Sequence, residues 1–153
     1  TLSREVAKFS SMFFLGRGIS YATALEARLK IMELSYIPSI AYPAGESKHG
    51  PISVIEEGYP VFFIAPNHET RKYLIGNIME MKARGARIFC VGAEGDEEVK
   101  QLSDWFLGLP ATHALLSPVV YIIPFQLLAY YTSIERGYDP DKPRNLAKSV
   151  TVL

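Results

Sequence analysis

The sequence predicts a strand–helix–strand unit at residues 61–91, which read VFFIAPNHETRKYLIGNIMEMKARGARIFCV. Residues 61–65 and 87–91 are short apolar runs of strand length. Between them, apolar residues recur at helical spacing, at Leu74, Ile75, Ile78 and Met81. Gly85 stands where helices commonly end. Units of this length build parallel sheets, so the segment indicates an α/β fold.

Two further apolar runs, residues 12–15 and 105–109, extend this pattern toward both ends of the chain. The first run is closed by the turn Gly16-Arg17-Gly18, after which Ser20 is a candidate N-cap. The helix that follows is expected to bury an apolar stripe made of Ala22, Leu25, Leu29, Met32 and Tyr36. We therefore predict one three-layer α/β domain with a doubly wound parallel sheet over residues 1–153.

The remaining segments are less regular. Residues 4–10 indicate the end of a helix, and residues 66–67 open the helix of the strand–helix–strand unit. Residues 42–51 are rich in glycine and proline, and residues 94–98 form an acidic loop or helix start. Residues 138–153 carry two prolines and are expected to be an irregular tail.

An uncharged stretch runs from residue 114 to residue 134 and is long enough to cross a membrane. Pro118, Pro124 and several polar side chains interrupt it, so a buried helix over residues 118–136 of a soluble domain fits better. Sixteen Lys and Arg residues balance sixteen Asp and Glu residues, which leaves no electrostatic footprint for nucleic acid or an anionic membrane. We expect neither as a partner.

Cysteine and histidine usage argues against disulfides and metal sites. Cys90 is the single cysteine, so the chain can form neither an internal disulfide nor a multi-thiolate zinc site, which indicates a reducing, cytoplasmic compartment. The three histidines share no spacing typical of metal ligands, and no metal or cofactor is expected. Thr1 in place of Met suggests a fragment or a processed chain.

Three charged residues of the first long helix are candidates for chemistry. Glu26, Lys30 and Glu33 are spaced four and then three apart, which places them on one face, opposite the apolar stripe. Such a triplet is commonly an exposed ion pair that contributes roughly a few tenths of a kcal/mol. A carboxylate beside an ammonium can also move a proton next to a sugar carbonyl, while the lysine stabilises the resulting enediolate. Helix spacing alone leaves both interpretations open.

Other segments carry further candidates. His49 lies between glycine-bounded turns, where an imidazole can be aimed at a ligand or can equally be an exposed loop residue. Lys148 in the tail is a solvated amine or, if burial lowers its pKa, an amine able to form a Schiff base with a ketose. Gly16 and Gly18 could bring backbone N–H groups near a ligand, although Tyr21 replaces the third glycine of a dinucleotide-binding fingerprint.

Taken in order, these motifs resemble the C-terminal half of the isomerase part of the glucosamine-6-phosphate synthase family, over residues 13–152. The residues that carry the resemblance are Phe14-Leu15-Gly16-Arg17-Gly18, Ala24-Leu25-Glu26, Leu29-Lys30, Glu33, Ser35-Tyr36-Ile37, Gly45-Glu46, Lys48-His49-Gly50-Pro51, Ala65-Pro66-Asn67 and the tail segment PRNLAKSVTV at 143–152. The resemblance implies a SIS (sugar isomerase) domain with a five-stranded parallel sheet, in which residues 138–153 form a tail over the active site.

The resemblance also implies a role for each candidate. Glu33 would be the base that moves a proton between C1 and C2 of a hexose phosphate, and Lys30 would stabilise the enediolate. His49 would assist ring opening in the active site of a neighbouring subunit of a homodimer, and Lys148 would react with or hold the open-chain ketose. Supporting or substrate-binding roles would fall to Glu26, Gly16, Gly18, Arg144 and Ala147.

The chain departs from the family in two ways. It has neither the glutaminase domain that supplies ammonia nor the preceding SIS half, whose Ser/Thr-rich loop holds the sugar phosphate. The equivalent loop here, residues 66–70, contains a single hydroxyl side chain, that of Thr70. We therefore expect conversion of fructose 6-phosphate and ammonia to glucosamine 6-phosphate in a longer protein, and little activity in these residues alone. The alternative is a stand-alone SIS domain that binds a phosphosugar in a regulatory or assembly role without catalysis.

Overall fold

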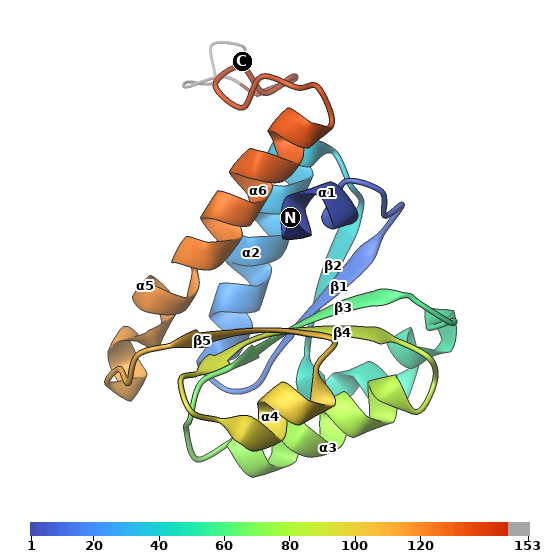
Figure 1. Cartoon of the computed structure of the whole chain (residues 1–153). Coiled ribbons are helices and arrows are strands. Elements are labelled where there is room, and N and C mark those ends of the chain that lie inside the picture. The colour runs from blue at the N-terminus through green and yellow to red at the C-terminus, as the bar shows by residue number, and fades with distance from the viewer. Residues whose placement is uncertain (147–153) are drawn as a thin grey trace, which may run out of the picture.

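The computed structural model describes residues 1–146 and contains a five-stranded, all-parallel sheet with the strand order β2-β1-β3-β4-β5 (Figure 1). The strands are β1 (Met12–Gly16), β2 (Ser39–Pro43), β3 (Pro60–Ala65), β4 (Arg87–Ala93) and β5 (Trp105–Leu109). The chain winds outward in both directions from the point between β1 and β3, as in doubly wound folds. The predicted fold class is confirmed.

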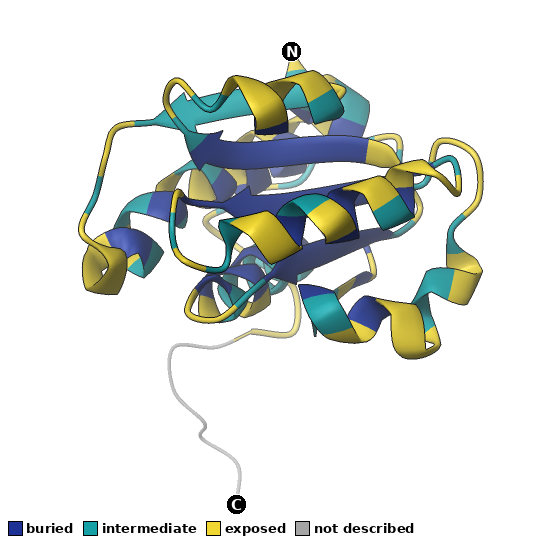
Figure 2. Ribbon diagram, turned by 90° about the horizontal axis from the view of Figure 1, so that it is seen from below, coloured by how far each residue is buried: buried dark blue, intermediate teal, exposed yellow. Residues whose placement is uncertain are grey.

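Helices cover both faces of the sheet, so the central strands are buried on both sides (Figure 2). The helices are α1 (Leu2–Val6), α2 (Ser20–Ser35), α3 (Arg71–Lys82), α4 (Glu97–Leu102), α5 (Ser117–Tyr121) and α6 (Ile123–Glu135), with short 3-10 helices η1 (Ala44–His49), η2 (Pro51–Val54) and η3 (Ala114–Leu116). Successive strand residues point to opposite faces. Phe62 of β3 therefore packs with α2 and α6, whereas Phe63 packs with α3.

Several local predictions need correction. Strand β2 was not predicted, because its five residues lie at the sheet edge, follow Pro38, end on Pro43 and include an exposed Ile40. Ser20 lies inside α2, whose N-cap residue is Ile19, and makes no capping hydrogen bond. The N-terminal helix occupies Leu2–Val6, earlier than the 4–10 expected, and α3 begins at Arg71, after a turn that follows Pro66.

The buried face of α2 also differs from the predicted stripe. The helix buries the small residues Ala24 and Ala27 together with Ile31, whereas Leu25 is exposed and Leu29 is half-buried. Helix α2 is covered by the sheet on one side and by α6 on the other, and small side chains let these elements approach closely. The larger apolar side chains are left on the flank of the helix.

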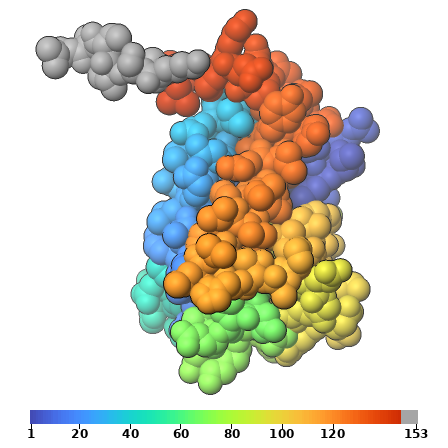
Figure 3. Space-filling view, turned by 90° about the vertical axis from the view of Figure 1, so that its left-hand side faces the viewer, coloured from blue at the N-terminus to red at the C-terminus, as the bar shows by residue number. Residues whose placement is uncertain are grey.

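The apolar segment near the C-terminus is two helices with an exposed face, not the single buried helix that was expected. Helices α5 and α6 run along α2 and form much of one side of the molecule (Figure 3). By length and composition, the stretch Ala114–Glu135 is apolar enough to cross a membrane. Of the residues in its most apolar 18-residue segment, 22% are buried in this structure. The large apolar side chains exposed on this stretch are Leu115, Leu116, Val119, Ile123, Leu127, Tyr130, Tyr131 and Ile134.

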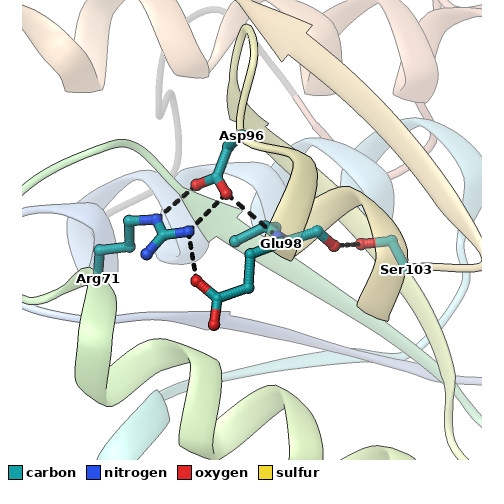
Figure 4. Close-up of polar contacts among 5 residues, drawn as sticks. Arg71, Asp96, Glu98 and Ser103 are labelled. Carbon is teal, nitrogen blue, oxygen red and sulfur yellow. Dashed lines mark hydrogen bonds and ion pairs between the residues drawn. The ribbon is translucent and has the colours of Figure 1, made fainter.

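Beneath the sheet, an ion-paired network joins the starts of α3 and α4 (Figure 4). The Arg71 guanidinium donates two hydrogen bonds of 2.6 Å to Asp96 and one of 2.9 Å to Glu98. Asp96 also accepts a hydrogen bond from the Val99 N–H and so caps α4. These contacts with Arg71, and then the bond from Val99, hold the pKa of the Asp96 carboxyl below its ordinary value, although burial opposes the shift.

We expect Asp96→Asn to lower the free energy of unfolding at pH 7 by about 1–3 kcal/mol, because Asn still caps a helix but loses the charged bidentate pair. A carboxyl with a lowered folded-state pKa stabilises the fold above its unfolded value, which is near 3.8, and this stability is lost as the pH falls through the folded-state value. Urea unfolding at several pH values should show the difference between the two proteins shrink below pH 3.8. A difference that is constant with pH would contradict the assignment.

Candidate active site

The charged triplet of α2 is assembled as its spacing predicts. The Lys30 Nζ lies 2.7 Å from Glu33 Oε2 and 3.3 Å from Glu26 Oε1. The hydrogen bond to Glu33 is the largest cause that raises the pKa of Lys30, against the opposing effect of burial, and Glu26 adds to it. The lysine is therefore a fixed ammonium at neutral pH, placed to stabilise negative charge beside Glu33.

Glu33 faces a cavity of about 460 Å³ at the C-terminal end of α2. Leu29 and Met32, two members of the apolar stripe, line its wall instead of the core, together with Ile37 and Pro38. The tail completes the cavity through Arg144, Asn145 and Leu146. The structure thus places a tail segment and Glu33 around one cavity, whose lining is largely apolar.

Tyr36 joins the tail to the end of α2. Its hydroxyl accepts a hydrogen bond of 2.9 Å from the Arg144 N–H, and the Arg144 guanidinium lies 3.8 Å from the centre of its ring. The Tyr138 ring packs edge-on against it at 4.7 Å. Of the predicted tail residues, Arg144 therefore reaches the site, whereas Ala147 and Lys148 lie outside the described residues.

The glycine turn lies at the other end of α2. Gly16 and Gly18 precede Ser20, and thirteen residues of helix at 1.5 Å each place Glu33 about 20 Å further along. A Cβ on Gly16 would overlap the Ser20 carbonyl oxygen, so this glycine permits a close approach of β1 to α2. Neither glycine lines the cavity of Glu33. Their predicted contact with substrate stays a prediction.

His49 also lies apart from Glu33 within one copy of the chain. It is exposed in η1, which follows the carboxyl end of β2, whereas the Glu33 cavity includes Pro38, just before the amino end of the same strand. Within one copy of the chain, the His49 imidazole and the Glu33 carboxylate therefore lie at different sites. The expectation that His49 serves a neighbouring subunit stays a prediction.

A second cavity of about 460 Å³ lies at the carboxyl edge of the sheet, beside the glycine turn. It is lined by residues 67–70, Gly18 and Thr112 among others, and no lysine or arginine lines it. Of the loop residues that line it, Thr70 offers a hydroxyl, and Asn67, His68 and Glu69 make up the rest.

Cys90 lies buried in β4, among the core residues on the α3 face of the sheet. Burial raises the pKa of the Cys90 thiol to about 12, so it is packed as a neutral thiol. Across residues 1–146, no group of three or more His, Cys, Asp or Glu side chains is placed to hold a metal ion.

Glu33→Gln is expected to lower the pKa of Lys30, since it replaces the nearer of the two carboxylates by a neutral amide. Glu26→Gln should lower it less, because that carboxylate is 3.3 Å away and more exposed. Titration of the Lys30 side chain by NMR would measure both shifts. The reverse order would contradict the geometry described for the triplet.

The sheet order and the helices on both faces make this a doubly wound α/β domain, and the charged triplet borders a cavity that the tail also lines. The chain belongs to the SIS domain family, whose sequence pattern matches residues 5–136. It is 48% identical over 99% of its length to the glutamine–fructose-6-phosphate aminotransferase (isomerizing) of Methanothermobacter thermautotrophicus, and 50% identical over 98% of its length to that of Symbiobacterium thermophilum. The chain spans about a quarter of the length of these curated relatives, 26% and 25%.

A solved structure gives the same relationship. The C-terminal domain of glucosamine-fructose-6-phosphate aminotransferase from Francisella tularensis superposes with a TM-score of 0.85 and 36% identity, over 92% of this chain and 40% of that one. The chain is therefore homologous to a part of these aminotransferases that lies in their C-terminal domain. The resemblance inferred from the motifs is confirmed.

Proposed function

We propose that this chain is the second sugar-isomerase half of a glutamine–fructose-6-phosphate aminotransferase (isomerizing), which makes glucosamine 6-phosphate from fructose 6-phosphate and ammonia. The observation that carries the proposal is the placement of Glu33, held 2.7 Å from the Lys30 ammonium, in a cavity that the tail residue Arg144 also lines. A sugar-binding module without catalysis has no need for a paired base and cation in one cavity.

In the proposed reaction, ammonia replaces the C2 oxygen of the open-chain ketose to give an imine and water. The Glu33 carboxylate then takes a proton from C1 and returns it to C2. In the same conversion the C1 hydroxyl loses its proton and the imine nitrogen gains one, which leaves the aldehyde at C1 and the amine at C2. The intermediate between these steps carries extra electron density on the C1 oxygen and the C2 nitrogen. Lys30 stabilises that density from the same helix face.

The proposal requires partner segments. The loop at residues 67–70 lines a cavity without lysine or arginine, so it has no evident group for binding phosphate. In the proposal, the preceding half of the longer protein binds the phosphate of the substrate. An exposed apolar surface on α5 and α6, with Val119, Ile123, Leu127 and Tyr131, suits burial against that half or a second copy. We place the activity in the cytoplasm, where the single, buried Cys90 stays reduced.

Subunit mixing in the longer protein tests the proposal and its shared site. Glu33→Gln and His49→Ala should each abolish synthesis of glucosamine 6-phosphate as homodimers. If His49 serves the neighbouring subunit, a heterodimer of the two variants regains one intact site out of two, so random mixing restores roughly a quarter of the wild-type rate. No recovery would refute the shared site, and wild-type longer protein without synthase activity would refute the proposed function.

A further inference from the structure

The end of α2 has a conformation that tyrosine does not favour. Tyr36 follows the helix with φ 57° and ψ 27°, in the left-handed region where helices usually place glycine or asparagine. Within residues 1–146, only Tyr36 and Asn145 combine a positive φ with a side chain. This conformation is strained for a side chain other than Gly or Asn, because the Cβ atom lies close to the following carbonyl oxygen. Glycine would end the helix in this conformation with less backbone strain. The need to end the helix therefore does not explain why the residue is a tyrosine.

The Tyr36 side chain is instead explained by the tail. Within residues 1–146, its side chain makes three polar or aromatic contacts, all with residues more than one hundred positions away. The phenol oxygen accepts from the Arg144 N–H, the ring face contacts the Arg144 guanidinium, and the ring packs against Tyr138. The hydrogen bond fixes the backbone of Arg144, and the cation–π contact fixes its side chain. Tyr36 follows Glu33 by three residues, so both contacts are made within one helical turn of Glu33.

We infer that Tyr36 is a positioning residue that docks the C-terminal tail onto α2, so that tail residues line the Glu33 cavity. This inference rests on the proposed function for its catalytic consequence. Lys148, to which the resemblance gives the amine, follows Arg144 by four residues in the sequence. Holding Arg144 keeps this residue at the wall of the Glu33 cavity, and pre-positioning of a group beside reacting atoms raises the rate of a reaction.

Tail docking can be measured without catalysis, by trypsin cleavage after Arg144 in the 153-residue chain. A lysine before Pro143 is a poor trypsin site, so Arg144 is the informative one in residues 138–146. Tyr36→Gly keeps the left-handed helix end and removes the ring, so cleavage should accelerate about tenfold or more with little change in melting temperature. Tyr36→Phe keeps the ring but loses the hydrogen bond and should give an intermediate rate.

The matched control is Tyr73→Phe, because Tyr73 also carries an arginine against its ring, Arg17 at 5.0 Å, but lies on α3. Its cleavage rate should equal that of the wild type. Equal cleavage of the Tyr36→Gly and wild-type chains would overturn the docking role, whatever the activity of the longer protein.

Kinetics of the longer protein test the catalytic consequence. Tyr36→Gly should lower kcat at least tenfold and leave KM for fructose 6-phosphate within about threefold, because the phosphate is bound by another segment. Tyr36→Phe should recover part of kcat. Faster cleavage with an unchanged kcat would overturn the positioning role. A wild-type longer protein without activity would refute the proposed function, while the cleavage result would still decide whether Tyr36 docks the tail.

Discussion

Glu33→Gln is expected to lower the rate of glucosamine 6-phosphate synthesis by ~10²–10⁴-fold in the longer protein, the range that a positioned general base contributes. Glutamine preserves the size of the side chain but cannot accept the proton from C1. Lys30 retains Glu26 as a partner at 3.3 Å, so the helix should stay folded. Because the phosphate is bound elsewhere in the proposal, KM should change little and the loss should fall on kcat.

Steady-state kinetics and melting temperature check this result together. Glu26→Gln is the comparison variant, since it removes a carboxylate from the same lysine but does not line the cavity. Its rate should fall less than about tenfold, as expected for an indirect effect on Lys30. A Glu33→Gln protein that keeps a rate within about threefold of wild type would mean that Glu33 is a structural ion-pair residue and not the base.

Gly16→Ala is expected to have the largest effect on stability, a loss of about 3 kcal/mol or more in the free energy of unfolding. The added methyl group would overlap the Ser20 carbonyl oxygen and lie 2.8 Å from the Tyr21 nitrogen. Both neighbours are backbone atoms at the start of α2, so β1 and the helix would have to move apart. That movement would disturb the packing of a strand whose five residues are all buried.

Gly18→Ala provides the matched comparison for Gly16→Ala. Gly18 has a positive φ of 57°, but its nearest neighbour to an added Cβ is the flexible Thr70 side chain at 3.5 Å. The cost should therefore be about 1 kcal/mol from backbone strain alone. Urea unfolding of both variants would give the two values. If Gly18→Ala were the more damaging of the two, the close approach of β1 and α2 would not be the reason for Gly16.

Local pattern was sufficient for much of this fold. The apolar runs that became β1, β3, β4 and β5 are strongly patterned, and the strand–helix–strand spacing at residues 61–91 has few other solutions. Strand β2 was not predicted, because a short edge strand that follows one proline and ends on another has no continuous apolar run. The triplet of Glu26, Lys30 and Glu33 was predictable for the same reason, since helix geometry alone places these residues together.

The sequence by itself determined which side chains share a strand or a helix face, because those relations depend on spacing along a regular backbone. Only the tertiary structure decided which face is inside. Helix α2 buries Ala24 and Ala27 because it is covered on two sides, which leaves Leu29 and Met32 for the cavity of Glu33. The contact of Tyr36 with Arg144 joins residues 108 positions apart, and no local pattern encodes such a contact, since it depends on how whole elements pack.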